Sequence, residues 1–194
     1  MKDPKGPRQP LTEEELRAAM VGGAEPTSGP IALAEYDEAW PGQFRREEDR
    51  IRAALGSRAL LVEHVGSTSV PGLAAKPVID ILLVVKDSAD EAAYVPALET
   101  AGYVLRIREP DWNQHRLFKG PEVDVNLHVF SSGCPEIDRM LAFRDRLRTH
   151  PVDRERYERV KRSLAARSWK YVQRYADAKT EVVESILAEA ERER

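Results

Sequence analysis

The feature that most constrains this chain is a near-continuous apolar run at residues 78–85, with the sequence VIDILLVV. An apolar run of this length predicts a central β-strand that other elements cover on both faces. One aspartate, Asp80, interrupts the run, and side-chain alternation puts it on the same face as Val78 and Leu82. An ionised carboxylate there costs free energy unless it is paired or binds a metal. We therefore interpret Asp80 as a functional residue; the alternative is a strand-end aspartate that caps a neighbouring loop.

Hydrophobic periodicity elsewhere predicts strands interleaved with helices, followed by a helical tail. Further strands are expected at residues 31–33, 59–65, 103–107, 115–119 and 123–130. Helices are expected at residues 37–55, 88–101, 136–148, 153–167 and 177–190, and residues 168–175 either join them or form a separate turn. Early strands with interleaved helices and then helices alone indicate an α+β, or mixed α/β, fold.

The first 30 residues differ from the rest of the chain and are expected to form a flexible N-terminal extension. The extension contains a short predicted helix at residues 12–21, which the glycine pair after it ends. Residues 31–194 are expected to form the folded domain.

Two pairs of residues have the spacing of a capping box, in which two side chains satisfy free backbone groups at the start of a helix. Thr12 and Glu15 form the first pair, and Ser88 and Glu91 form the second. They predict the beginnings of the helices at 12–21 and 88–101.

Composition and charge limit the classes of function. Of the 194 residues 42% are hydrophobic and 32% are charged, which is typical of a soluble globular domain. The net charge of −3 argues against nucleic acid as a partner, since such binders are usually basic. No run approaches the roughly 18 apolar residues of a membrane span. The single cysteine, Cys134, allows no disulfide within the chain, and we expect a cytoplasmic protein.

The loop before the apolar run has the composition of an anion-binding turn. Gly66 permits a positive φ and a close approach of the backbone to a ligand. Ser67, Thr68 and Ser69 add three hydroxyls, and Lys76 adds a cation nearby. Because backbone amides in such a turn can point inward around an anion, the loop predicts a phosphate-binding site.

Two later strands carry polar residues. Asp124, Asn126 and His128 alternate onto one face of the strand at 123–130, and they complete a site if that strand pairs beside Asp80.

In the strand at 115–119, His115 and Lys119 share a face and Arg116 takes the other. These three residues predict contacts with phosphate or carboxylate. A solvated edge strand whose charges discourage pairing explains them equally well.

Several separated motifs resemble the GrpB family, within the nucleotidyltransferase-like fold superfamily. The main one is EHVGSTSVPGLAAKPVIDI at residues 63–81. In the same order follow HRLFK, NLHVF, FRDRLRTHP and YADAKTEVV, and Trp40-Pro41 with Phe44 precede them. The resemblance extends roughly from residue 31 to residue 190, and it implies a mixed β-sheet with packed helices and a helical C-terminal tail.

The resemblance also implies roles for particular residues. Nucleotidyltransferase-fold proteins hold a nucleoside triphosphate with a Gly-Ser turn, and they hold magnesium with an acid-x-acid pair and a third acid on a later strand. Gly66-Ser67 followed by Asp80 looks like this arrangement, but Leu82 stands where the second acid is expected. Asp124 is the best substitute acid. The family's YADAKT stretch suggests that Lys179 reaches the site.

This comparison predicts Mg²⁺ or Mn²⁺ at Asp80, Asp124 and His128, with His128 acting as a ligand, a general base or a substrate contact. Two functions follow. The first is an enzyme that transfers a nucleotidyl or phosphoryl group, with metal assistance, from a nucleoside triphosphate to a small-molecule acceptor. The second is a domain that binds a nucleotide or a CoA-like compound without turnover. The family also resembles a domain joined to dephospho-CoA kinase.

Overall fold

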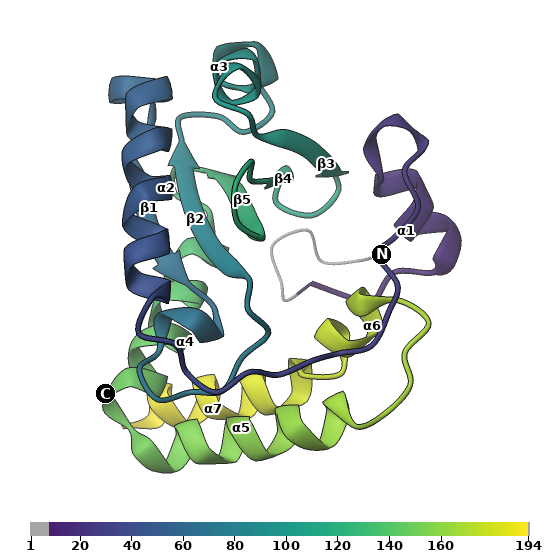
Figure 1. Ribbon diagram of the computed structural model, residues 1–194, viewed down its shortest axis with the longest axis vertical. Helices are drawn as coiled ribbons and strands as arrows, with labels where there is room; N and C mark the ends of the chain where they lie inside the picture. Colours follow the sequence, from purple (N-terminus) through teal and green to yellow (C-terminus); the bar gives the residue numbers. More distant parts are fainter. Residues whose placement is uncertain (1–7, 194) are drawn as a thin grey trace.

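The computed structural model describes residues 8–193, which are built around a five-stranded mixed sheet (Figure 1). The strands are β1 Leu61–Val65, β2 Ile79–Val85, β3 Val104–Glu109, β4 His115–Lys119 and β5 Val125–Ser131. Their order in the sheet is β1-β2-β5-β4-β3. The central pair, β2 and β5, is parallel, and the other neighbours are antiparallel.

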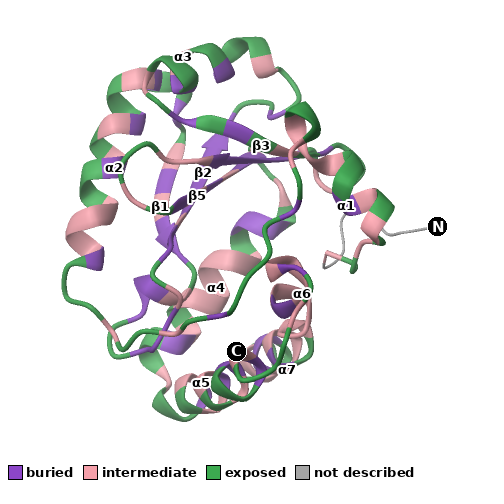
Figure 2. Ribbon diagram, turned by 45° about the vertical axis from the view of Figure 1, so that its right-hand side comes forward, coloured by how far each residue is buried: buried purple, intermediate pink, exposed green. Residues whose placement is uncertain are grey.

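Helices lie on both faces of the sheet and continue into a C-terminal helical layer (Figures 1 and 2). They are α1 Glu13–Ala19, α2 Trp40–Leu55, α3 Val95–Thr100, α4 Pro135–Thr149, α5 Pro151–Ala165, α6 Val172–Asp177 and α7 Thr180–Arg192. Helices α2 and α3 cover one face and α4 the other, while α5 and α7 pack on α4. The predicted α+β fold with a helical C-terminal tail is confirmed. Among the described residues, no helix has both the length and the apolarity that crossing a membrane requires.

Strand β2 is the centre of two hydrophobic clusters, which explains its apolar sequence. On one face, Ile79, Ile81 and Leu83 pack with residues of α2 and α3. On the other face, Leu82 and Val84 pack with residues of α4. The prediction of a central strand covered on both faces is confirmed. Asp80, the second residue of β2, lies outside the hydrophobic cluster that packs with α4.

The N-terminal segment packs against the domain over its described part. Helix α1 has the predicted capping box: the Glu15 N–H donates to Thr12 Oγ1 and the Thr12 N–H donates to Glu15 Oε2. Met20 then forms a β-bridge with Ile107 of β3. The segment therefore adds to the edge of the sheet, and residues 1–7 of the predicted extension lie outside the described residues.

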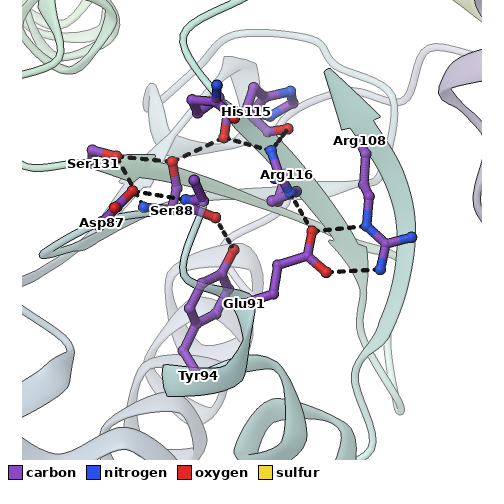
Figure 3. A network of polar contacts seen from close by, with 10 residues as sticks. Asp87, Ser88, Glu91, Tyr94, Arg108, His115, Arg116 and Ser131 are labelled. Carbon is purple, nitrogen blue, oxygen red and sulfur yellow. Dashed lines mark hydrogen bonds and ion pairs between the residues drawn. The ribbon is translucent and has the colours of Figure 1, made fainter. Parts of the chain in front are cut away.

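Two local predictions are wrong because tertiary contacts override them. The expected helix at 88–101 is a short 3₁₀ turn followed by α3, since Tyr94 has a non-helical backbone. The Ser88–Glu91 capping box does not form: Ser88 Oγ donates to the Gln114 carbonyl, and the Glu91 carboxylate accepts from arginines (Figure 3). The expected strand at 31–33 is reduced to one β-bridge between Ala34 and Ala75.

Candidate functional site

The Asp80 carboxylate lies against the turn that precedes β2, as the sequence predicted. Residues Val65 and Asp80 are register partners in the antiparallel β1–β2 pair, so Gly66 follows directly beside Asp80. Gly66 has φ +66°, and a Cβ there would lie 2.3 Å from Asp80 Oδ2. Glycine is therefore required both by the backbone and by the contact. The Asp80 side chain is 26% exposed, so solvent and ligands can reach it.

The hydroxyls of the loop after Gly66 have different roles. Thr68 Oγ1 donates to the Val78 carbonyl at 3.1 Å and accepts from His64 Nε2 at 3.0 Å. Ser69 Oγ donates to the Gly66 carbonyl at 2.6 Å. Both side chains are buried, so they shape the loop and do not face a ligand. Ser67 is partly exposed and remains the hydroxyl available for contact with a ligand.

Helices α4 and α2 fix the ends of the loop. Arg148 Nε donates to the Ser69 carbonyl at 2.9 Å, and Arg144 Nη1 donates to the His64 carbonyl at 3.1 Å. On the other side of the sheet the His64 ring stacks on Phe44 with 4.8 Å between centroids. Burial lowers the pKa of His64 to about 4, against the opposing charge of Asp80, so this ring is neutral near pH 7.

A hydrogen-bonded row crosses three strands at the level of Asp80. Asn126 Nδ2 of β5 donates to Asp80 Oδ1 at 2.8 Å. Lys119 Nζ of β4 donates to Asn126 Oδ1 at 2.8 Å and to Asp124 Oδ1 at 2.7 Å. This row confirms that the strand at residues 125–131 pairs beside Asp80. Asn126 was recognised in the sequence only as a polar neighbour, but it is the direct partner of Asp80.

His128 occupies the next level of the same face. It is the register partner of Leu82, and its Nε2 lies 3.7 Å from Asp80 Oδ1. Its Nδ1 lies 3.1 Å from Nε2 of His115, whose own Nδ1 lies 2.8 Å from Glu109 Oε2. His115 is buried behind His128, so the prediction that it contacts phosphate directly does not match its position.

Lysines from separate segments surround the Asp80 carboxylate. The charges of Asp80 and Lys179 both act on Lys76, which precedes β2, and on Lys161 of α5. The Lys179 ammonium lies 4.7 Å from the centre of the Tyr175 ring. Together with Lys119, these residues put positive charge around one carboxylate, which is the composition expected of a site for a polyanion.

Lys161 is the most buried of these lysines, with 1% of its surface exposed. Its Nζ donates to the Ala74 carbonyl and lies 4.9 Å from the centre of the Tyr157 ring. Burial, with a smaller contribution from the charge of Lys179, lowers the pKa of Lys161 to about 7. Burial also raises the pKa of Tyr157 to about 12, while its hydrogen bond with Ser67 opposes that shift.

The ionisation state of Asp80 reflects opposing effects. Burial raises its pKa, but the hydrogen bonds and charge of His128, the amide of Asn126 and the charge of Lys179 outweigh burial. The net pKa is below the ordinary value for aspartate, so Asp80 is an anion near neutral pH.

The carboxylates do not form the predicted three-ligand metal site. Asp124 is 56% exposed and its Oδ1 is paired with Lys119. Within residues 8–193, no group of three His, Cys, Asp or Glu side chains is placed to hold a metal. Asp80 and His128 offer two donors, and magnesium bound by so few takes its other ligands from water and substrate phosphates. The Mg²⁺ or Mn²⁺ assignment stays a prediction.

Arg116 lies apart from Asp80. Its guanidinium is on the opposite face of the sheet, where Nε donates to Glu91 Oε1 at 2.6 Å (Figure 3). Arg108 donates to both oxygens of the same carboxylate at 2.7 Å. This position corrects the assignment of Arg116 to the phosphate-binding residues.

The sequence did not indicate Lys161, Tyr157 or Glu109 as site residues. All three are brought to the site by contacts between residues far apart in the sequence. One example is the hydrogen bond from Lys161 Nζ to the carbonyl of Ala74, which is 87 residues away in the sequence. Their side chains match ordinary amphipathic or edge-strand patterns, so no local signal distinguishes them.

Comparisons with known proteins agree with this fold. A family model described as GrpB protein matches residues 30–189. A UPF0157 protein of Halalkalibacterium halodurans is 62% identical over 181 residues, which cover 93% of each chain. The crystal structure of the conserved protein GrpB from Enterococcus faecalis superposes with a TM-score of 0.65 and 31% identity, over 79% of this chain and 98% of that chain.

A longer relative contains a similar segment. The dephospho-CoA kinase of Mycolicibacterium paratuberculosis is 33% identical over 165 residues, which are 72% of this chain and 40% of the relative. The family model matches most of the length of this chain, and the relatives above agree with it. The chain therefore belongs to the GrpB family.

Proposed function

We propose that this protein binds a nucleoside triphosphate beside Asp80 and transfers its nucleotidyl group to a hydroxyl of a small acceptor. The observation that supports the proposal is that Lys76, Lys119 and Lys179 lie within electrostatic or hydrogen-bond reach of one carboxylate group, Asp80, and its neighbours beside the Gly66 turn. The resemblance of Gly66-Ser67 and Asp80 to the nucleotidyltransferase pattern supports the same conclusion.

The lysines supply the charge that a triphosphate requires. Lys76 and Lys179 form no ion pair within residues 8–193, so a phosphate does not have to displace a carboxylate from them. Lys179 instead contacts the Tyr175 ring. Preorganised cations of this kind stabilise charge that develops on phosphate oxygens, and they need little reorganisation during the reaction.

In the proposed reaction, Asp80 and His128 act on the acceptor. In this proposal the acceptor hydroxyl donates its one hydrogen bond to His128 Nε2, and the Asp80 carboxylate, whose Oδ1 lies 3.7 Å from that nitrogen, stabilises the positive charge that forms on the imidazole when the hydroxyl oxygen loses its proton. That oxygen attacks the α-phosphorus, the hydroxyl proton passes to His128 Nε2, and the bond from the α-phosphorus to the bridging oxygen breaks. Pyrophosphate leaves with the electron pair of that bond. Positioning and general-base catalysis account for the rate in this scheme.

Thermal unfolding with each of ATP, GTP, CTP and UTP, with and without Mg²⁺ or Mn²⁺, tests the binding step. A nucleotide at a hundred times its Kd stabilises the protein by about 2.7 kcal/mol. Lys179→Ala is expected to reduce the shift, whereas the exposed Lys86→Ala serves as a matched control and leaves it unchanged. If neither variant alters the shift, or no nucleotide stabilises the protein, binding at this site is contradicted.

Release of pyrophosphate in the presence of mixed small alcohols and metabolite extracts tests the transfer step. Wild-type protein is expected to release pyrophosphate and Asp80→Asn to lose that activity. Pyrophosphate release at equal rates from both proteins would reject the assigned role of Asp80.

A second function, binding without turnover, is favoured by Leu82. This residue stands where the second acid of the nucleotidyltransferase pattern belongs, and it is fully buried in the apolar cluster beneath α4. A relative of this segment within a mycobacterial dephospho-CoA kinase makes a CoA-like compound the alternative ligand. Stabilisation by dephospho-CoA or a nucleotide without pyrophosphate release would favour this function.

A further inference from the structure

The position of Lys179 at the site depends on a short helix. Lys179 lies between α6 and α7, and its charge acts on both Asp80 and Lys76. Helix α6 has six residues, and a helix this short is not stable by itself in water. What holds α6 in place therefore also decides where the Lys179 ammonium lies.

The N-terminal segment, which we define as residues 8–30, holds α6 and the residue before it. The Val172 N–H donates to the Thr27 carbonyl at 2.9 Å. Arg17 Nη2 donates to the Tyr171 hydroxyl at 3.0 Å. Figure 1 shows the chain after α1 passing α6 on its way to α2. Helix α6 is thus anchored by contacts with a part of the chain that is distant in sequence.

Arg8 joins this segment to both sides of the site. Its Nε and Nη2 lie 2.7 and 2.6 Å from Glu109 Oε1 of β3, and its Nη1 donates to Asp177 Oδ1 of α6 at 3.2 Å. On one side, Glu109 Oε2 lies 2.8 Å from Nδ1 of His115, which is buried behind the site. On the other side, Asp177 is two residues before Lys179. One guanidinium therefore connects the β3 edge of the sheet with the junction of α6 and α7.

The bridge is largely buried, and its geometry suits an arginine. Between 7% and 18% of each of the three side chains is exposed, so water and salt screen these charges little. Within α6, Gln173 Nε2 donates to Asp177 Oδ1 and Arg174 Nη1 lies 3.6 Å from Oδ2, while Arg8 adds a contact from another element. A guanidinium donates to two carboxylates in a fixed planar geometry, which an ammonium on a flexible stem does not reproduce.

We propose that Arg8 is a positioning residue of the Asp80 site. By joining β3 to α6, it holds the junction of α6 and α7 so that the Lys179 ammonium faces the phosphates of the bound nucleotide. The contact of Lys179 with phosphate rests on the proposed function, whereas the bridge between β3 and α6 does not. Residues 8–29 precede the stretch 30–189 that matches the family model, so the bridge belongs to a part of the chain that the model does not describe.

Calorimetric titration of the full-length protein with ATP and Mg²⁺ tests the proposal. Arg8→Gln removes the guanidinium and keeps one amide donor. We expect the Kd for ATP to rise by about 5- to 10-fold, at the lower end of the range for coupling between separate sites. An unchanged Kd in a folded variant would overturn the positioning role.

Arg8→Lys distinguishes the bridge from the charge alone. It keeps the positive charge, but its ammonium lacks the planar fork that contacts both carboxylates. We expect Arg8→Lys to bind ATP as weakly as Arg8→Gln. Wild-type affinity in Arg8→Lys would show that a charge at this position is sufficient, and it would overturn the bridging role.

Combination with Lys179→Ala identifies the residue through which Arg8 acts. If Arg8 positions Lys179, Arg8→Gln has no further effect on the Kd for ATP once Lys179 is replaced, because the effects of residues that act as one unit do not add. Equal fold losses in both backgrounds would contradict the proposal and indicate a general structural effect.

Arg146→Gln is the matched control. Arg146 also joins a buried carboxylate, that of Asp153 in α5, to an exposed one, that of Glu193 after α7. It contacts the end of α7 opposite Lys179. We expect Arg146→Gln to bind ATP as the wild type does, and a loss equal to that of Arg8→Gln would overturn the specific role of Arg8.

Hydrogen exchange of backbone amides, measured without a ligand, separates this inference from the proposed function. We expect Arg8→Gln to speed exchange at residues 172–183 by about tenfold, the factor that corresponds to losing one charged hydrogen bond. Arg146→Gln should leave exchange in that stretch unchanged. Protection of the β2 amides verifies that each variant is folded, and Arg8→Lys replaces Arg8→Gln if the latter is unfolded.

The two measurements fail in different ways. Unchanged exchange at residues 172–183 in the folded Arg8 variant would overturn the bridge itself, whatever the affinity for ATP. If the wild type does not bind ATP, the proposed function and the phosphate contact of Lys179 are refuted, while the exchange rates still decide whether Arg8 holds α6.

Discussion

Two polar clusters lie on opposite faces of the sheet, and they handle their carboxylates differently. Glu91 is bound by Arg108 and Arg116, so its charge is offset by two guanidinium groups in direct contact (Figure 3). Asp80 contacts the neutral amide of Asn126 and lies 3.7 Å from His128 Nε2, while the charge of Lys179 acts at longer range. A cluster that is internally paired serves the fold. The Asp80 cluster includes Lys76 and Lys179, which form no ion pair among residues 8–193, and we therefore propose this cluster as the one that binds a ligand.

Neutralising the Asp80 and Glu91 carboxylates one at a time is the most direct test of the difference between the two clusters. Asp80→Asn is expected to lower kcat/KM for nucleotidyl transfer by about 10²- to 10³-fold, the range for loss of one preorganised electrostatic group. Glu91→Gln is expected to leave kcat/KM unchanged, because its cluster faces away from the site. Steady-state kinetics of both variants measure the contrast, and equal losses would show that the two clusters do not differ in function.

Acid titration gives the next largest expected effect. The folded pKa of His64 is about 4 because of burial, compared with an unfolded value near 6.5. The unfolded chain therefore takes up the proton first, and stability falls as the pH decreases from about 6.5 to about 4. The shift corresponds to about 3 kcal/mol. Urea unfolding at several pH values is expected to show this loss in the wild type and a smaller one in His64→Gln.

The paired cluster has no histidine, so its response to acid should differ. The hydrogen bond from Arg108 lowers the pKa of Glu91, with burial opposing and the hydrogen bond from Arg116 adding to it. Its stabilisation is present above the ordinary pKa of glutamate and is lost only at lower pH. Glu91→Gln should therefore follow the wild type between pH 6.5 and 5, and a changed slope in that interval would contradict this assignment.

Alanine substitutions at two glycines, Gly66 and Gly72, separate the effect of the contact with Asp80 from the effect of backbone conformation on the free energy of unfolding. Gly66→Ala is expected to destabilise the protein by more than the roughly 1–2 kcal/mol that a left-handed backbone costs an L-residue. The added cause is the Cβ, which would lie 2.3 Å from Asp80 Oδ2. Gly72→Ala has φ +76° but meets nothing within 4 Å, so it measures the backbone cost alone. Equal free energies of unfolding for the two variants would contradict the importance of the contact.

The smallest expected effect on stability is that of removing Arg108, the exposed member of the cluster around Glu91. Arg108 is 44% exposed, so its bond to Glu91 is a surface ion pair. Arg108→Ala is expected to lower the free energy of unfolding by about 0.2–1 kcal/mol. Denaturant unfolding at low and high salt measures it, and a loss of several kcal/mol would show that this cluster is more than a surface network.

The sequence predicts the cluster around Asp80 better than the cluster in which Glu91 pairs with Arg108 and Arg116. Side-chain alternation correctly put Asn126 and His128 on one face of β5, because a two-residue period is a local property, whereas Asp124 lies just before the strand. Capping-box spacing failed at Ser88 and Glu91, because arginines distant in sequence bind Glu91. Local propensity is a weak guide where tertiary contacts offer a charged residue a better partner.

The parts of the site that could not be predicted depend on long-range packing. Lys161 was indistinguishable from a solvated helix lysine until α5 placed its Nζ at the Ala74 carbonyl. Glu109 matched an ordinary edge-strand residue until the chain brought it to His115. Side-chain alternation in β4 correctly predicted that Arg116 and His115 point to opposite faces of the sheet. The sequence did not show which other residues lie on each face, such as Glu91 beside Arg116.

The hydrogen-bonded row of Asp80, Asn126 and Lys119 also bears on how the sheet assembles. Parallel neighbours such as β2 and β5 are joined by a long connection, so their alignment is not set by a tight turn. Moving β5 along β2 by two residues would keep every apolar side chain on its own face, so alternation of apolar and polar residues does not by itself exclude that alignment. It would, however, leave Asp80 without its amide and Lys119 without its acceptor. The side chains that we propose as part of the ligand site thus also favour the native alignment of β5 with β2 over an alignment that is shifted by two residues.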